Sequence, residues 1–307
     1  MPMLTGMLPV LPTPFSVDGA IDMSAMQRVA AFALSAGVDG IVFPGFASEV
    51  SELTADERSL LLTAVVREVD GKVPVVAGGS AKEAGDVITH GRAAMALGVG
   101  YLMVQPPLHL GNELEHVAAF LGEIALALPD MRIILQNAPA PRGSDLSPDT
   151  ILQIAERIAQ IAYVKEETLP AGPAISRIMA KRPPSLQGVI GGGGARYILD
   201  EYERGACAAM PAVEIADLHV ALDRAWREGQ RGKARDLYVR TLPLLTLQAV
   251  YRMRLTKHVL IRRGILENVE VRAPTPELDE LALLDIDRNL FELGLIDNAE
   301  TVGAGAV

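Results

Sequence analysis

Short continuous runs of apolar residues, each followed by a stretch with helical periodicity, recur along the first two thirds of this 307-residue chain. Continuous rather than alternating runs are typical of strands buried on both faces, as in parallel sheets covered by helices. The predicted strands are Met7–Pro12, Gly40–Phe43, Val73–Ala77, Tyr101–Val104, Arg132–Leu135, Ala162–Lys165, Leu186–Ile190 and Ala206–Met210. A row of such units favours a closed (β/α)8 barrel, with an open doubly wound sheet as the alternative.

Helix start signals support this division. The predicted helices include Met26–Ser35, Glu57–Val69, Ala84–Leu97, Leu114–Leu126 and Thr150–Gln160. Thr54 and Glu57 form a capping box, and Ser147 before Pro148 places a cap and then a proline at the first helical position. Gly37, Gly98 and Gly205 each follow a helical run and suit a left-handed residue that ends a helix.

The pattern changes after roughly Arg227 to helices without intervening strands. We expect these helices over Lys233–Leu247, Val250–Gly264 and Pro276–Leu293. The chain is therefore expected to form a barrel over residues 1–228 and a helical appendage over residues 229–307. Its last residues, Asn298–Val307, are small and lack periodicity, which predicts a frayed tail.

Composition excludes several classes of partner. The formal net charge of −10 lacks the basic footprint of a protein that binds nucleic acid or an anionic membrane. Because Cys207 is the only cysteine, neither an intramolecular disulfide nor a thiolate-rich metal site is expected. The segment Met1–Phe15 has no basic start and contains four prolines, which argues against a signal peptide, and no apolar run is long enough to span a membrane. We expect a cytoplasmic protein that acts on a small molecule.

Lys165 is the sharpest local clue to chemistry. It ends the apolar strand Ile161–Lys165, whereas Lys82, Lys181, Lys233 and Lys257 fall in or beside helices, where a solvated face is the ordinary explanation. An ammonium at a strand end is partly desolvated, which favours the neutral amine that can attack a carbonyl carbon. The alternative is a structural ion pair between Lys165 and a following glutamate, Glu166 or Glu167.

The loops after other strands carry groups that suit a ligand. Glycine and polar residues there permit close backbone approach and supply hydrogen bonds. The candidates for substrate binding are Gly45, Phe46, Ala47, Ser48 and Glu49 after the second strand, His109 after the fourth, Asn137 after the fifth, and Gly191 and Gly192 after the seventh. Gln136, beside Asn137, is costly to bury unless its amide is hydrogen-bonded. The other histidines lie in helical patterns, as surface or packing residues, and the acidic residues show no metal-ligand spacing.

These strand-end residues together resemble the dihydrodipicolinate synthase and N-acetylneuraminate lyase family of class I aldolases. The matching segments, in the family's order, are Pro12–Phe15, Asp18-Gly19, Ile21-Asp22, Gly37–Gly40, the Gly45–Glu49 loop, Leu53-Thr54, Glu57-Arg58 and Val75–Gly78. The resemblance implies a barrel without metal or cofactor, a Schiff base on Lys165, and a homotetramer or dimer.

Departures from the family pattern indicate one branch. Gln136 stands where the family's proton-relay tyrosine would be, and Phe46-Ala47 replaces its threonine pair. The arginine that grips the semialdehyde in the lysine-pathway synthase would fall at Pro141, with Arg142 one place later. Four loop motifs are instead similar to those of 2-keto-3-deoxy-pentonate (L-2-keto-3-deoxyarabonate) dehydratases, namely Ser48-Glu49, Pro106–His109, Gln136–Pro139 and Lys165–Thr168.

The resemblance implies that Lys165 forms an imine with a 2-oxo acid whose carboxylate lies on the Phe46–Glu49 loop. Gln136 is not a base near neutral pH, so dehydration is favoured over aldol cleavage, with Glu167 as the catalytic acid or base. Two alternatives remain, a pyruvate-dependent aldolase and a catalytically silent 2-oxo acid sensor. For assembly, the apolar residues Leu242, Leu244, Leu245, Leu247, Val250, Val259, Leu260 and Ile261 exceed what one exposed helix pair should show.

Overall fold

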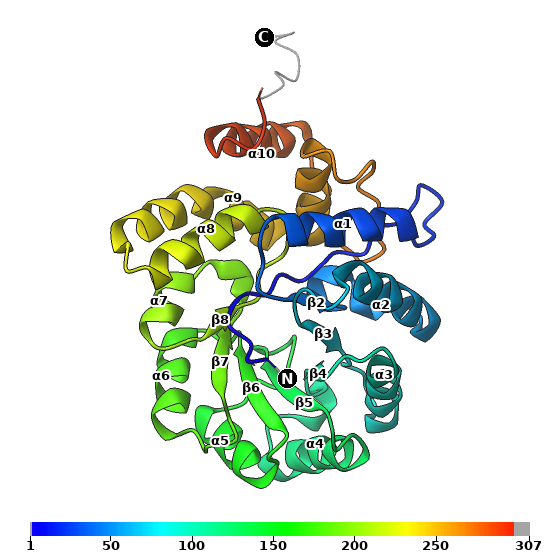
Figure 1. Ribbon diagram of the computed structural model, residues 1–307, viewed down its shortest axis with the longest axis vertical. Helices are drawn as coiled ribbons and strands as arrows, with labels where there is room; N and C mark the ends of the chain where they lie inside the picture. The colour runs from blue at the N-terminus through cyan, green and yellow to red at the C-terminus, as the bar shows by residue number, and fades with distance from the viewer. Residues whose placement is uncertain (1, 298–307) are drawn as a thin grey trace.

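The computed structural model describes residues 2–297, and over this range eight parallel strands form one sheet in the order β1-β8-β7-β6-β5-β4-β3-β2. The strands are β1 (Gly6–Met7), β2 (Ile41–Phe43), β3 (Val75–Gly78), β4 (Tyr101–Val104), β5 (Arg132–Asn137), β6 (Ile161–Glu166), β7 (Gly188–Gly191) and β8 (Ala208–Ala209). Val10 closes the sheet because it bridges both Val42 of β2 and Ala212, which follows β8. The predicted (β/α)8 barrel is confirmed, and the open doubly wound sheet is excluded (Figure 1).

The first strand is shorter than the predicted Met7–Pro12. Pro9 and Pro12 have no N–H group to donate to a neighbouring strand, so regular pairing covers Gly6–Met7. Closure of the barrel continues through single hydrogen bonds: Val10 N donates to Pro211 O at 2.8 Å, and Leu11 N donates to Val42 O at 3.1 Å.

Helices cover the outside of the barrel (Figure 1). They are α1 (Met23–Ser35), α2 (Ala55–Val69), α3 (Ala84–Ala96), α4 (Leu114–Ala127), α5 (Pro148–Arg157), α6 (Ala171–Lys181), α7 (Ile198–Glu203) and α8 (Ala216–Arg227). The capping box at α2 is confirmed, because Glu57 N donates to Thr54 Oγ1 at 3.2 Å and Thr54 N donates to Glu57 Oε2 at 3.0 Å. Ser147 caps α5, with Pro148 in its first turn, as predicted.

The C-terminal helices differ from the prediction. The two helices expected over Lys233–Leu247 and Val250–Gly264 form one element, α9 (Arg231–Arg262), with a break at Arg252. The third helix, α10 (Glu280–Glu292), starts later than Pro276 because the Asp279 side chain accepts from Ala282 N and caps it. The tail expected over residues 298–307 lies outside the described residues.

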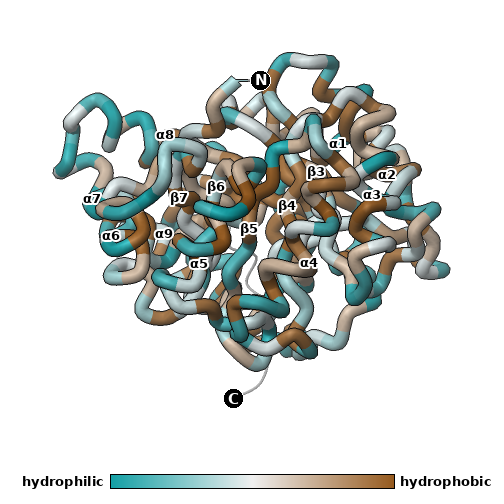
Figure 2. Tube along the Cα trace, turned by 90° about the horizontal axis from the view of Figure 1, so that it is seen from below, coloured by the Kyte–Doolittle hydropathy of each residue, from teal (hydrophilic) through white to brown (hydrophobic). Residues whose placement is uncertain are grey.

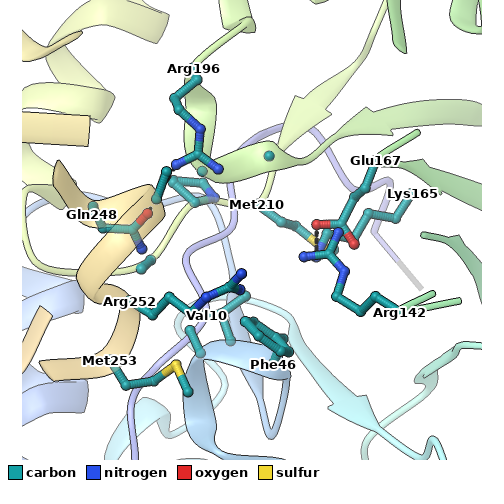
Figure 3. Close-up of a pocket in the computed structure, with 16 residues that line it drawn as sticks. Val10, Phe46, Arg142, Lys165, Glu167, Arg196, Met210, Gln248, Arg252 and Met253 are labelled. Atoms are coloured by element: carbon teal, nitrogen blue, oxygen red, sulfur yellow. Dashed lines mark hydrogen bonds and ion pairs between the residues drawn. The ribbon is translucent and has the colours of Figure 1, made fainter. Parts of the chain in front are cut away.

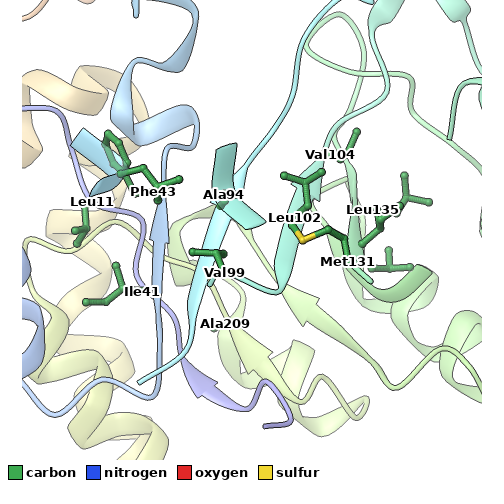
Figure 4. Close-up of a cluster of buried hydrophobic side chains, with 14 of the residues drawn as sticks. Leu11, Ile41, Phe43, Ala94, Val99, Leu102, Val104, Met131, Leu135 and Ala209 are labelled. Carbon is green, nitrogen blue, oxygen red and sulfur yellow. The ribbon is translucent and has the colours of Figure 1, made fainter. Parts of the chain in front are cut away.

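Apolar side chains fill two layers of the barrel. The larger cluster lies between the strands and the surrounding helices and includes Ile41, Phe43, Leu102 and Leu135 (Figure 4). A smaller cluster fills the barrel interior. Figure 2 shows hydrophobic stretches along the strands in the middle of the molecule and hydrophilic stretches outside. Within residues 2–297, no helix has the length and apolar character needed to cross a membrane.

The apolar surplus predicted for subunit contacts is largely used inside the chain. Leu244, Leu245 and Val259 of α9 pack in a third cluster with Ile286 and Leu290 of α10. The sequence pattern overestimated the exposed apolar area because it does not show that α10 folds back onto α9 (Figure 1).

Candidate active site

Lys165 and Glu167 meet at the carboxyl end of β6. Side chains alternate between the two faces of a strand, so residues two positions apart, such as Lys165 and Glu167, point to the same face. The Nζ atom of Lys165 lies 3.4 Å from Oε1 of Glu167, and both side chains are buried. Both residues lie at the carboxyl-terminal end of the barrel strands, which is where the active sites of such barrels are found.

Gln136 reaches Glu167 from the neighbouring strand β5. Gln136 and Lys165 are paired in register, and Gln136 Nε2 donates to Glu167 Oε2 at 2.6 Å. Burial alone would raise the pKa of Glu167, but the positive charges of Lys165 and Arg142 and the Gln136 hydrogen bond outweigh burial and hold the pKa below its usual value. Glu167 is therefore an ionised carboxylate between an amine and an amide.

The pKa values of two neighbouring glutamates, Glu166 and Glu201, are raised rather than lowered. Burial raises the pKa of Glu166, although Asn137 and Thr168 donate hydrogen bonds to it. Burial also raises the pKa of Glu201 of α7 to about 8, and the nearby charge of Glu167 adds to the rise. The surroundings therefore shift the pKa values of these neighbouring carboxyls in opposite directions, and Glu167 is the one whose ionised form is favoured. No local pattern indicates a role for Glu201, because it lies in a helix 34 residues after Glu167.

A cavity of about 150 Å³ opens beside the Lys165–Glu167 pair. Phe46 and Ala47 line it, together with Gly193 and Gly194 after β7. Sequence reasoning did not place three arginines here: Arg142, Arg196 and Arg252 (Figure 3). Gln248 and Arg252 come from α9, so the appendage forms one wall of the cavity.

Three residues predicted to bind substrate are bonded within the chain instead, and a fourth, His109, lies away from the cavity beside Lys165. Ser48 Oγ donates to Leu11 O at 2.5 Å and accepts from Gly45 N at 2.8 Å. Glu49 is buried and paired with Lys257 at 2.7 Å, so Lys257 is not on a solvated face as expected from its helix. Asn137 bonds to the backbone of Leu146 and to Glu166. His109 lines a separate hollow beside Lys82 and His116.

Gly191 and Gly192 make room for two carboxyl groups. A Cβ atom at Gly192 would lie 2.9 Å from both Cδ and Oε1 of Glu167, and one at Gly191 would lie 2.7 Å from Cδ of Glu201. Both distances are too short for real contacts. These glycines therefore shape the site by leaving space for Glu167 and Glu201, while Gly193 and Gly194 face the cavity.

A buried lysine and an ionised carboxylate lie together at the end of the (β/α)8 barrel where enzymes of this fold have their active sites. Comparison with known proteins identifies the family. The model of the dihydrodipicolinate synthetase family matches residues 3–292, and the chain belongs to this family of lyases.

Similar proteins within the family differ in their activities. L-2-keto-3-deoxyarabonate dehydratase of Azospirillum brasilense is 31% identical over 300 residues, covering 94% of this chain and 96% of its own. A protein of Escherichia coli K12 described as a probable 2-dehydro-3-deoxy-D-pentonate aldolase is 27% identical and covers 80% of this chain and 81% of its own. The crystal structure of dihydrodipicolinate synthase from Rhodopseudomonas palustris superposes with a TM-score of 0.87 at 26% identity, over 94% of this chain and 97% of its own.

Proposed function

We propose that Lys165 forms a Schiff base with C2 of a 2-keto-3-deoxy sugar acid, such as 2-keto-3-deoxyarabonate, and that the enzyme removes water across C3 and C4. One observation carries the proposal: the ionised Glu167 carboxylate lies 3.4 Å from Lys165 Nζ in a cavity. Similarity to the Azospirillum dehydratase supports the substrate class.

In the proposed reaction the Lys165 amine attacks C2 and water leaves, which gives an imine that acidifies the protons on C3. Glu167 removes a C3 proton and then, as the acid, protonates the C4 hydroxyl, which departs as water. For 2-keto-3-deoxyarabonate, loss of a proton from C5 and return of one to C3 give the enol of a semialdehyde. Hydrolysis of the imine releases this product and the free Lys165 amine.

The backbone of the loop after β2 suits the 2-oxo acid's own carboxylate. Phe46 and Ala47 begin the short 3-10 helix η1 (Phe46–Ser48), and the first N–H groups of a helix have no partner within it. Both residues line the cavity next to Lys165. We propose that these two N–H groups hold the carboxylate, and that the Ser48 and Glu49 side chains fix the loop.

Borohydride trapping tests the Schiff base. With pyruvate or 2-keto-3-deoxyarabonate, reduction is expected to add the mass of the reduced adduct to the peptide that carries Lys165. Lys165→Ala should abolish the adduct, while Lys181→Ala, at an exposed lysine, is the matched control. Absence of an adduct with any 2-oxo acid, or an unchanged adduct in Lys165→Ala, would overturn the proposal.

The products separate dehydration from cleavage. Aldol cleavage needs a base for the C4 hydroxyl, and Gln136 in contact with Glu167 is an amide. The expected product from 2-keto-3-deoxyarabonate is a semialdehyde without pyruvate. Stoichiometric pyruvate and an aldehyde would instead make this protein an aldolase, the activity named for the E. coli relative.

We also propose that the protein is a cytoplasmic homotetramer or dimer, as the family resemblance implies. Val239 and Val250 of α9 remain 51% and 53% exposed and are available for a subunit contact. Light scattering at micromolar concentration should give a multiple of the 32.7 kDa chain mass. A monomer mass would contradict the proposal.

A further inference from the structure

The cavity carries more positive charge than one carboxylate can balance. Among the described residues, its lining includes the cations Lys165, Arg142, Arg196 and Arg252 and the single carboxylate Glu167, a formal excess of three positive charges. The carboxylate of a simple 2-oxo acid supplies only one negative charge. The lining therefore favours a substrate with a second anionic group.

Arg252 lies in the cavity because α9 is broken there. Its backbone has φ 49° and ψ −123°, a conformation that glycine adopts freely and that other residues rarely adopt. Such a conformation is strained for a residue with a side chain and persists where the surrounding structure enforces it, often at functional sites. Figure 3 shows Arg196 and Arg252 pointing into the cavity from the side opposite Lys165, whereas Arg142 extends towards Glu167.

Phe46, which replaces a threonine of the family pattern, supports two of these arginines. The guanidinium carbons of Arg142 and Arg252 each lie 5.3 Å from the centre of its ring, within the range of a cation–π contact. An aromatic ring at this position therefore holds two guanidinium groups at the mouth of the cavity.

Of the two arginines opposite Lys165, Arg196 is held in place by hydrogen bonds and Arg252 has its guanidinium available for an anion. Arg196 Nη1 donates to Gln248 Oε1 at 3.0 Å and to Leu245 O at 3.2 Å. Both partners belong to α9, so these bonds hold the Arg196 guanidinium against that helix. No carboxylate within residues 2–297 forms an ion pair with Arg252. A guanidinium binds a carboxylate through two parallel hydrogen bonds, which gives both affinity and geometry.

We propose that Arg252, with Arg196, binds a second carboxylate at the far end of the substrate, so that the preferred substrate is a 2-keto-3-deoxy sugar diacid. This inference rests on the proposed Schiff-base function. The diacid goes beyond the proposed function, because 2-keto-3-deoxyarabonate ends in a hydroxymethyl group and has no second carboxylate. Lys165 and Glu167 act on C2 to C4 in either substrate, and the distal carboxylate determines how tightly the substrate binds.

The test compares kcat/KM for matched 2-keto-3-deoxy acids that end in hydroxymethyl, carboxylate or phosphate. The wild type should prefer the diacid by about 100-fold over the monoacid, and Arg252→Met should reduce this ratio by about tenfold or more, chiefly through KM. Arg252→Gly, which keeps the backbone conformation without the guanidinium, should act in the same way. Arg235→Met, at an exposed arginine of α9, is the control and should keep the wild-type ratio.

Two results would overturn the inference: no preference for the diacid, or a preference that survives both Arg252 variants. A stronger preference for the phosphorylated acid would overturn the assignment of a carboxylate. Borohydride trapping of the wild type with pyruvate separates this failure from failure of the proposed function. An adduct without diacid preference rejects only the diacid, whereas no adduct rejects the Schiff-base function itself.

Discussion

The Nζ atom of Lys165, near the end of β6, lies 3.4 Å from the Oε1 atom of Glu167, the first residue after the strand. Glu167→Gln keeps the size of the side chain and removes its basicity. The variant should still form the borohydride-trapped adduct while kcat falls by about 10²- to 10⁴-fold. Glu166→Gln is the comparison, because its carboxyl contacts Asn137 and Thr168, and it should lose less than about tenfold. Equal losses in both variants would contradict a catalytic role for Glu167.

Gly192→Ala tests whether the position of Glu167 matters. The added Cβ would lie 2.9 Å from Cδ and Oε1 of Glu167 and must displace the carboxylate. Because a misplacement of about 1 Å can cost about 100-fold in rate, kcat should fall by roughly that factor with the fold retained in circular dichroism. Gly122→Ala in α4 meets nothing within 4 Å and serves as the control. Normal turnover in Gly192→Ala would show that Glu167 tolerates displacement.

The barrel was predictable because its signals are local. Continuous apolar runs place β4 at Tyr101–Val104 as predicted, and Thr54 and Ser147 mark helix starts within one turn of their partners. The position of Lys165 near the end of a buried strand was predictable for the same reason, because the five residues Ile161–Lys165 are enough to show it. Its catalytic role stays a prediction. The division of the chain at residues 228 and 229 stays a prediction.

The cavity was less predictable because its walls come from distant segments. Arg252 reaches the site through a helix break that no local residue signals, and Pro243 lies inside the helical part of α9 without ending it. Glu49 was predicted to bind substrate, and its ion pair with Lys257 was missed because Lys257 lies 208 residues away in the sequence. Long-range pairing of buried charges cannot be read from residue spacing along one chain segment.

The buried pair Glu49–Lys257 should contribute to stability rather than to chemistry. Lys257 Nζ lies 2.7 Å from Glu49 Oε1, and the N–H groups of Arg272 and Ala273 donate to Oε2. Lys257→Met leaves a buried carboxylate without its cation and should lower the free energy of unfolding by about 3–5 kcal/mol in urea denaturation. Adding Glu49→Gln should recover part of this loss.

The control for the buried pair is an exposed one. Arg177 and Asp149 form an ion pair in which the side chains are 49% and 56% exposed. Arg177→Met should lower the free energy of unfolding far less than Lys257→Met does, because water screens exposed pairs. A loss in Lys257→Met no larger than in Arg177→Met would show that the buried pair is not a structural link between the β2 loop and α9.

His219 of α8 should make the fold sensitive to acid. It is 1% exposed, and neither ring nitrogen has a hydrogen-bond partner among the described residues. Burial lowers its pKa to about 4 from the ordinary 6.5, with Asp217 opposing the shift. The unfolded chain therefore takes up a proton between these pH values while the folded chain does not. The contribution of His219 to stability is complete above pH 6.5 and is lost as the pH falls towards 4.

The expected size follows from the two pKa values. Between pH 7 and pH 5 the wild type should lose about 2 kcal/mol of unfolding free energy through this group. His219→Phe and His219→Leu remove the titration, so both should lose about 2 kcal/mol less than the wild type over the same interval, whatever their stability at pH 7. His116→Phe, at an exposed histidine of α4, is the control and should match the wild type. Urea denaturation at pH 5, 6 and 7 measures all four proteins. A wild-type loss that persists unchanged in both His219 variants would show that other groups cause the acid sensitivity.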